Sequence, residues 1–116
     1  MEPNTRACLA LIAAGLISGR NGTSVYDHAR GRHVTISGSI SASSVNIYDH
    51  DRGCHVSGSA TNLYDHGRSA HISLQINGNS FSGYDHGAGH HFSGNVSGSS
   101  VLIYDHGESS HFNYSV

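Results

Sequence analysis

The sequence has no lysine and no tryptophan, a single proline and two cysteines, and charged residues make up only 12% of its 116 positions. Six scattered arginines form no basic stripe for phosphate contacts, so nucleic-acid binding is not expected. Cys8 and Cys54 are too few for a disulfide framework, and we expect both thiols to be free. The apolar runs are too short to span a bilayer, so no transmembrane segment is predicted.

Residues 1–20 differ in composition from the rest of the chain. The apolar stretch Ala7–Ile17, preceded by Asn4 or Thr5 as a helix cap, predicts a short helix that is apolar on nearly all sides. We expect this helix to pack on the rest of the protein; the alternative is a targeting or membrane-surface segment. Its flanking charges cancel, so no convincing signal peptide is present. The compartment is left unknown, either cytoplasmic or reached by a non-obvious export route.

Residues 21–116 contain one motif five times. The motif is Tyr-Asp-His, then four further residues, then a second His followed by Val, Ile or Phe. It begins at positions 26, 48, 64, 84 and 104, so the units are of unequal length. Internal repetition of this kind indicates a repeated supersecondary unit, and the unequal spacing places the insertions between units.

Each unit predicts a β-hairpin. Apolar and polar residues alternate before the tyrosine, as in Val45–Tyr48, and again after the second histidine, as in Val34–Ser37. A four-residue loop between the two histidines would set them opposite one another. The fold class is therefore mainly β: a ten-stranded antiparallel meander of five hairpin repeats over residues 21–116. We expect this single domain to be curled around, or covered by, the helix of residues 1–20.

In that register one histidine per strand lies in a continuous row on the polar face. The row consists of His28, His33, His50, His55, His66, His71, His86, His91, His106 and His111. Two residues away lies a ladder of Tyr26, Tyr48, Tyr64, Tyr84 and Tyr104. Facing imidazoles could share a Zn, Cu or Ni ion. In the alternative, the histidines and tyrosines stack as a ladder that stiffens the sheet and needs no cofactor.

An aspartate precedes the first histidine of every unit: Asp27, Asp49, Asp65, Asp85 and Asp105. Adjacent residues of a strand point to opposite faces, so this pattern does not predict a catalytic or metal-binding Asp–His pair. We expect each aspartate to accept hydrogen bonds from N–H groups of its own hairpin loop. No motif of the GxSxG or HExxH kind occurs, and we predict no enzymatic activity.

The first and last predicted strands, residues 23–27 and 111–116, contain no proline, no lysine and almost no charge. Soluble proteins usually protect such edges, so the two strands either close a barrel or pair between molecules. The sequence therefore predicts a non-enzymatic structural protein that self-assembles into a homo-oligomer or filament through its edge strands or its His/Tyr face. The alternative is a small binding module that uses the His/Tyr row for a transition metal or a glycan.

Overall fold

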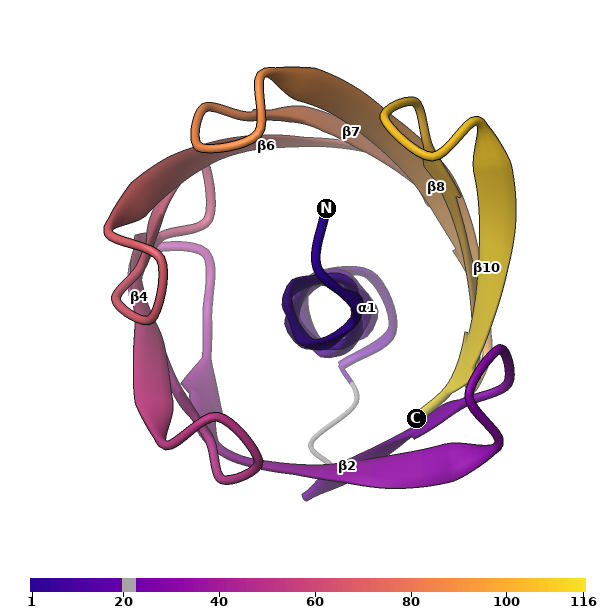
Figure 1. The fold of residues 1–116 in the computed structure, drawn as a ribbon, viewed down its shortest axis with the longest axis horizontal. Coiled ribbons are helices and arrows are strands. Elements are labelled where there is room, and N and C mark those ends of the chain that lie inside the picture. The colour runs from indigo at the N-terminus through magenta and orange to yellow at the C-terminus, as the bar shows by residue number, and fades with distance from the viewer. Residues whose placement is uncertain (20–22) are drawn as a thin grey trace.

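The computed structural model describes residues 1–19 and 23–116, and shows ten antiparallel strands closed into a barrel around one helix (Figure 1). The helix is α1 (Pro3–Ser18). The strands are β1 (Ser24–Asp27), β2 (Arg32–Ile40), β3 (Val45–Asp49), β4 (Cys54–Ser59), β5 (Asn62–Asp65), β6 (Ala70–Asn77), β7 (Ser80–Asp85), β8 (His90–Ser97), β9 (Ser100–Asp105) and β10 (Ser110–Ser115).

Each strand pairs with its neighbours in sequence, and β1 pairs with β10 to close the barrel. The predicted ten-stranded meander is thus confirmed, with closure within one chain. The expected boundary between residues 1–20 and 21–116 lies at residues outside those described. Within the described residues, no helix is long and apolar enough to cross a membrane.

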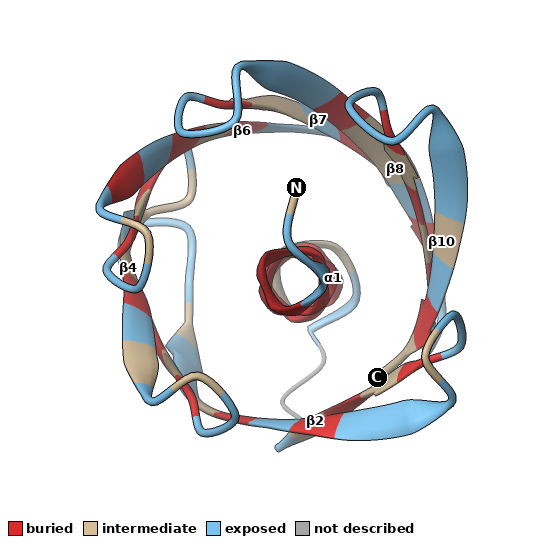
Figure 2. Ribbon diagram, in the orientation of Figure 1, coloured by how far each residue is buried: buried red, intermediate tan, exposed pale blue. Residues whose placement is uncertain are grey.

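The alternation of apolar and polar residues decides which side of the wall each side chain occupies. Most apolar residues of the strands are buried, as Figure 2 shows for the wall and the helix, and Ile76 is an exception at 38% exposed. The core contains Val25, Val34, Ile36, Ile47, Val56, Leu63, Ile72, Leu74, Phe92 and Ile103, each 0–1% exposed. The apolar face of the sheet, opposite the predicted polar face, is therefore the inside of the barrel.

The helix lies on the barrel axis, and its residues 4–14 are all buried. A helix that is apolar all round needs cover all round, which the closed wall provides. It begins with Pro3 in the first turn and ends at Gly19, whose left-handed backbone (φ 67°) lets its N–H reach the carbonyls of Ala14 and Gly15. The predicted cap at Asn4 or Thr5 is wrong, because both residues lie inside the first turn.

Two glycines of the inner face make room for phenylalanine rings of the neighbouring strand. Gly83 faces Phe92, and Gly94 faces Phe81. A Cβ atom at Gly83 would lie 2.5 Å from the Phe92 ring, and one at Gly94 would lie 2.6 Å from the Phe81 ring. The glycines therefore serve packing within the wall.

The hairpin register differs by two residues from the predicted one. The tyrosine of each unit, and not its first histidine, faces the second histidine. The pairs are Tyr26–His33, Tyr48–His55, Tyr64–His71, Tyr84–His91 and Tyr104–His111. The four-residue loop starts at the first histidine, because the fourth residue after each aspartate takes a left-handed backbone. These residues are Gly31, Gly53, Ser69, Gly89 and Ser109.

A continuous histidine row also requires the second histidine of each unit to face the first histidine of the next. Three of the four links between units have this register, with Gly58 facing Leu63, Ile76 facing Phe81 and Val96 facing Val101. The longest link differs. His50 does not face His33, because β2 pairs Ser37 with Tyr48. The two-residue shifts preserve the side of the wall on which each side chain lies, but they interrupt the row of histidines.

Candidate functional site

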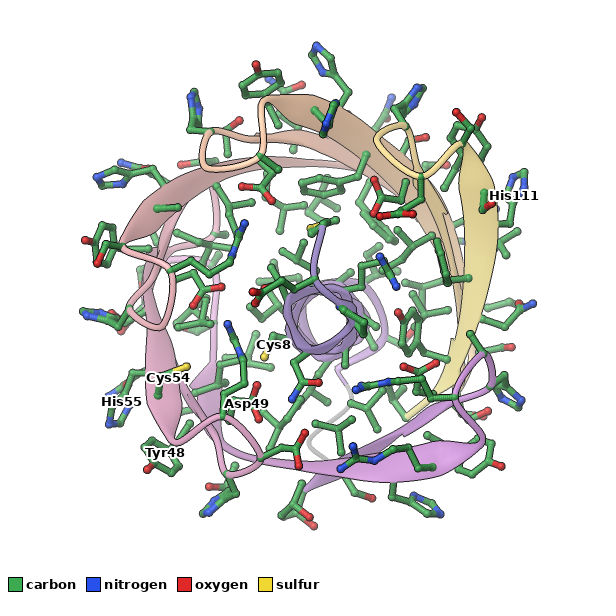
Figure 3. All side chains as sticks on the ribbon, viewed as in Figure 1. Cys8, Tyr48, Asp49, Cys54, His55 and His111 are labelled. Carbon is green, nitrogen blue, oxygen red and sulfur yellow. The ribbon has the colours of Figure 1, made fainter. Side chains whose placement is uncertain are left out.

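All ten histidines of the repeats are exposed on the outside of the barrel, near the end that carries the five hairpin loops. We call them the histidine belt. The five repeat tyrosines lie half-buried among them. Figure 3 shows Tyr48, His55 and His111 on the outer side of the wall, with Asp49 and Cys8 inside. The belt is thus the main aromatic and imidazole surface of the repeats.

Each tyrosine of the belt region packs edge-on against two histidines. Tyr48, for example, lies 4.8 Å from His50 and 4.7 Å from His55 between ring centroids. The same arrangement recurs at the other four tyrosines, with ring separations of 4.6–4.9 Å. Such contacts between rings hold the side chains in place and stiffen the wall.

Serine hydroxyls hold three of the belt imidazoles. The Nε2 atoms of these rings lie 2.8 Å from serine Oγ atoms, in the pairs His28–Ser115, His50–Ser37 and His66–Ser57. These serines stand on the neighbouring strand in each case. The contact at His28 also spans the seam where β1 meets β10, so the belt contributes to closure of the barrel.

The belt is not the continuous row that the sequence predicted. Six histidines face one another in three pairs, in which the second residue donates its backbone N–H to the carbonyl of the first: His55–His66, His71–His86 and His91–His106. His28 and His50 donate instead to Asn113 and Thr35. His33 and His111 face tyrosines. Across residues 1–19 and 23–116, no group of three or more metal-ligating side chains converges.

The five aspartates lie on the inner side of the wall, each 0–1% exposed. One carboxylate oxygen of each accepts a hydrogen bond from a loop N–H two residues later, at 2.9–3.0 Å. The donors are Ala29, Asp51, Gly67, Gly87 and Gly107. These hydrogen bonds lie at the mouths of the hairpins, where they fix the loops from which the belt projects.

Arginines from three of the loops pair with the second carboxylate oxygens. Arg52 donates to Asp49 at 2.6 Å and to Asp65 at 3.0 Å. Arg68 lies 3.0 Å from Asp65 and 2.9 Å from Asp85. Arginine therefore alternates with aspartate around this side of the barrel. Bidentate contacts of this kind suit the planar guanidinium group.

Residues at the N-terminal end of α1 provide further hydrogen-bond and ion-pair partners for the aspartates. The Asn4 amide donates to Asp49 at 3.2 Å, and the Thr5 hydroxyl donates to Asp65 at 3.0 Å. Arg6 and the N-terminal ammonium of Met1 both pair with Asp105, at 3.0 and 3.1 Å. The loop end is thus tied to the helix by polar contacts.

We call this set the buried charge ring: five cations and five carboxylates that balance in charge. The cations are Arg6, Arg30, Arg52, Arg68 and the N-terminal ammonium, and the carboxylates are Asp27, Asp49, Asp65, Asp85 and Asp105. Sequence reasoning did not find it. The available signal was the arginine at the third loop position of three units, together with polar residues directly before the apolar helix.

The pKa of Asp65 in the ring and the pKa of Cys8 beside it are shifted in opposite directions. Burial raises the pKa of Asp65, but hydrogen bonds from Arg52 and Arg68 outweigh burial and the net pKa is lowered. Burial, followed by the nearby charge of Asp49, raises the pKa of the Cys8 thiol. The carboxylate therefore stays charged and the thiol stays protonated, which is unsuited to nucleophilic catalysis.

A shallow hollow of about 830 Å³ lies in the outer wall across β6 to β10. Among the residues that the structure describes, no carboxylate and no arginine lines it. Amide, hydroxyl and aromatic groups predominate, and the lining includes Gln75, Asn77, Ser80, Ser82, Ser93, Asn95, Tyr104 and His111. The small serines leave room between the longer amides, so the hollow offers neutral hydrogen-bonding groups beside a tyrosine ring.

Cys8 and Cys54 are both free, as predicted. Comparison of the chain with protein-family models, with curated proteins and with solved structures finds no match.

Proposed function

We propose that the protein is a non-enzymatic structural module that associates with further copies of itself through the histidine belt. The observation that carries the proposal is the inward placement of charge. Among the described residues, the exposed charged side chains are Glu2, Arg32, Asp51 and Glu108. The other charged residues that the structure describes belong to the buried charge ring. The outer wall is therefore polar, aromatic and nearly free of like-charge repulsion, a condition that favours association.

Closure of the barrel directs association to the wall. β1 and β10 pair within one chain, at Tyr26–Ser115 and Asp27–Tyr114, so the sheet closes on itself. The helix fills the barrel interior. Tyrosine edges, imidazoles and hydroxyls on the wall provide hydrogen-bonding and aromatic groups of the kind found in polar protein interfaces.

Sedimentation velocity over a wide concentration range, with EDTA present, tests this proposal. The wild-type chain should gain mass as concentration rises. The variant H71E/H91E, which places two carboxylates in the belt, should remain monomeric. The matched control S43E/S99E adds the same charge at exposed turns of the opposite end and should behave like the wild type. A wild type that is monomeric throughout, or a belt variant that associates equally well, would overturn the proposal.

The neutral hollow supports a second candidate function, the binding of a glycan. Amides and hydroxyls can hydrogen-bond to sugar hydroxyls, and the ring of Tyr104 provides an apolar surface beside them. Glycan-array screening followed by titration would test it, with Q75A/N95A expected to lose the bound saccharide. Asn62→Ala removes an exposed amide outside the hollow and should keep it. Equal binding by all three proteins, or none by the wild type, would exclude this candidate.

A further inference from the structure

The three facing pairs of the histidine belt differ from its other four members in their access to a shared ligand. Facing residues of an antiparallel pair have Cβ atoms about 4.5–5.5 Å apart, whereas diagonal neighbours are about 7–8 Å apart. His91 and His106 have ring centroids 6.4 Å apart. Both rings are exposed to solvent on the outside of the wall. A small rotation therefore brings their nitrogens toward one point outside the wall.

Two imidazole nitrogens form a two-ligand site for a late first-row transition ion. Such ions bind imidazole at about 2.0–2.1 Å, so the two nitrogens must approach to about 3 Å. Facing strand positions hold the two rings closer to this separation than diagonal positions do. Water completes the coordination sphere because no third protein ligand is in reach among the described residues.

The residues around the histidine pairs favour the binding of a metal ion. Each paired histidine rests against a tyrosine; His55 lies 4.7 Å from Tyr48, and His66 lies 4.8 Å from Tyr64. These contacts limit the rotation of the rings before an ion binds, which reduces the entropy lost on binding. The inner aspartates are on the other side of the wall and do not compete as ligands.

We propose that each chain binds three divalent transition ions, Zn²⁺ or Ni²⁺, one at each facing pair: His55/His66, His71/His86 and His91/His106. The sites are independent of self-association, because both protein ligands of each ion come from one chain. Among the described residues, only the first pair has a ring nitrogen already bonded to a side chain, His66 to Ser57. That pair should bind least tightly.

Because some belt histidines are paired and others are not, metal binding can be tested with two matched triple variants. The triple variant H66Q/H86Q/H106Q removes one ligand from every pair. The control H28Q/H33Q/H50Q removes the same number of imidazoles from unpaired positions. Both would be made with Cys54→Ser, because a thiol is itself a zinc ligand. Ion uptake would be measured by equilibrium dialysis against Zn²⁺ and, separately, Ni²⁺, and imidazole resonances would be followed by NMR during the zinc titration.

The parent and the control should take up three ions per chain, with imidazole shifts confined to the six paired histidines. The pair variant should take up none at the metal concentration that saturates the parent. Absence of uptake by the parent would overturn the proposal. So would equal losses in the two triple variants, or a stoichiometry of one ion per repeat. Sedimentation of the parent in EDTA reports on self-association separately.

Discussion

Replacing Arg52 with alanine tests the buried charge ring where it is most concentrated. The guanidinium group joins Asp49 at 2.6 Å to Asp65 at 3.0 Å, and both carboxylates are 0% exposed. Removing one partner of a buried ion pair costs about 3–5 kcal/mol, because a charge is left inside without its counter-ion. Asp49 retains Asn4 and Asp65 retains Thr5 and Arg68, so we expect the lower end, about 3 kcal/mol.

The assay is thermal and urea unfolding of Arg52→Ala beside Arg32→Ala. A loss of about 3 kcal/mol lowers the Tm of a chain of this length by roughly 10–15 °C. Arg32 pairs with Asp51 on the surface, where its side chain is 48% exposed, so its removal should cost at most about 1 kcal/mol. Equal and small losses in the two variants would refute the claim that the ring is an integral part of the core.

Four further outcomes follow from the packing, the loops and the ring. Ile12→Ala should lower the free energy of unfolding by about 2–5 kcal/mol, since this side chain is fully buried between helix and wall; an unchanged urea midpoint would argue that the helix lies elsewhere. Ser69→Gly and Ser109→Gly should each raise that free energy by about 0.5–1 kcal/mol, because both serines have left-handed backbones (φ 52° and 53°) that glycine adopts without strain; a decrease in either variant would contradict this. Burial opposes ionisation of Asp105, but the N-terminal ammonium and Arg6 lower its pKa overall, as arginines do for Asp65. Folded pKa values below the unfolded ones mean that the unfolded chain binds more protons, so stability should be full above about pH 4 and fall as pH drops through the lowered values; a Tm series that is flat down to pH 2 would contradict it.

The side of the wall on which each side chain lies could be predicted from the sequence. Successive residues of a strand point to opposite sides, so the alternation of apolar and polar residues determines it. A two-residue error in register leaves the inward and outward sets unchanged, so apolar residues such as Val25 and Ile36 lie on the side opposite the histidines although the predicted hairpin register was wrong. The links at residues 77–80 and 97–100 have the register that the predicted histidine row requires, because their turn residues are flanked on both sides by apolar residues that face each other. The helix followed from its uniformly apolar composition.

The hairpin register and the charge ring could not be obtained by the same reasoning. The loop was counted between the two histidines, whereas its length is fixed by the left-handed position four residues after each aspartate. Glycine at three of these five positions, Gly31, Gly53 and Gly89, indicates a left-handed backbone. The other two positions are Ser69 and Ser109, and serine does not indicate one. The ring depends on long-range contacts such as Arg6 with Asp105, which no local pattern reveals. The three histidine pairs across the shorter links were predicted correctly. The row is interrupted because the predicted pairing was wrong within each hairpin and across the longest link.

Closure of the barrel within one chain is the central claim, because it removes the edges and leaves the wall as the binding surface. The most direct measurement is an isotope-filtered NOE experiment on a mixture of labelled and unlabelled chains. It would observe the seam pairs Tyr26–Ser115 and Asp27–Tyr114. We expect these cross-strand contacts only within a single labelled chain, even where the protein associates. Contacts between labelled and unlabelled chains at these positions would show that β1 and β10 pair between molecules, and would contradict the account.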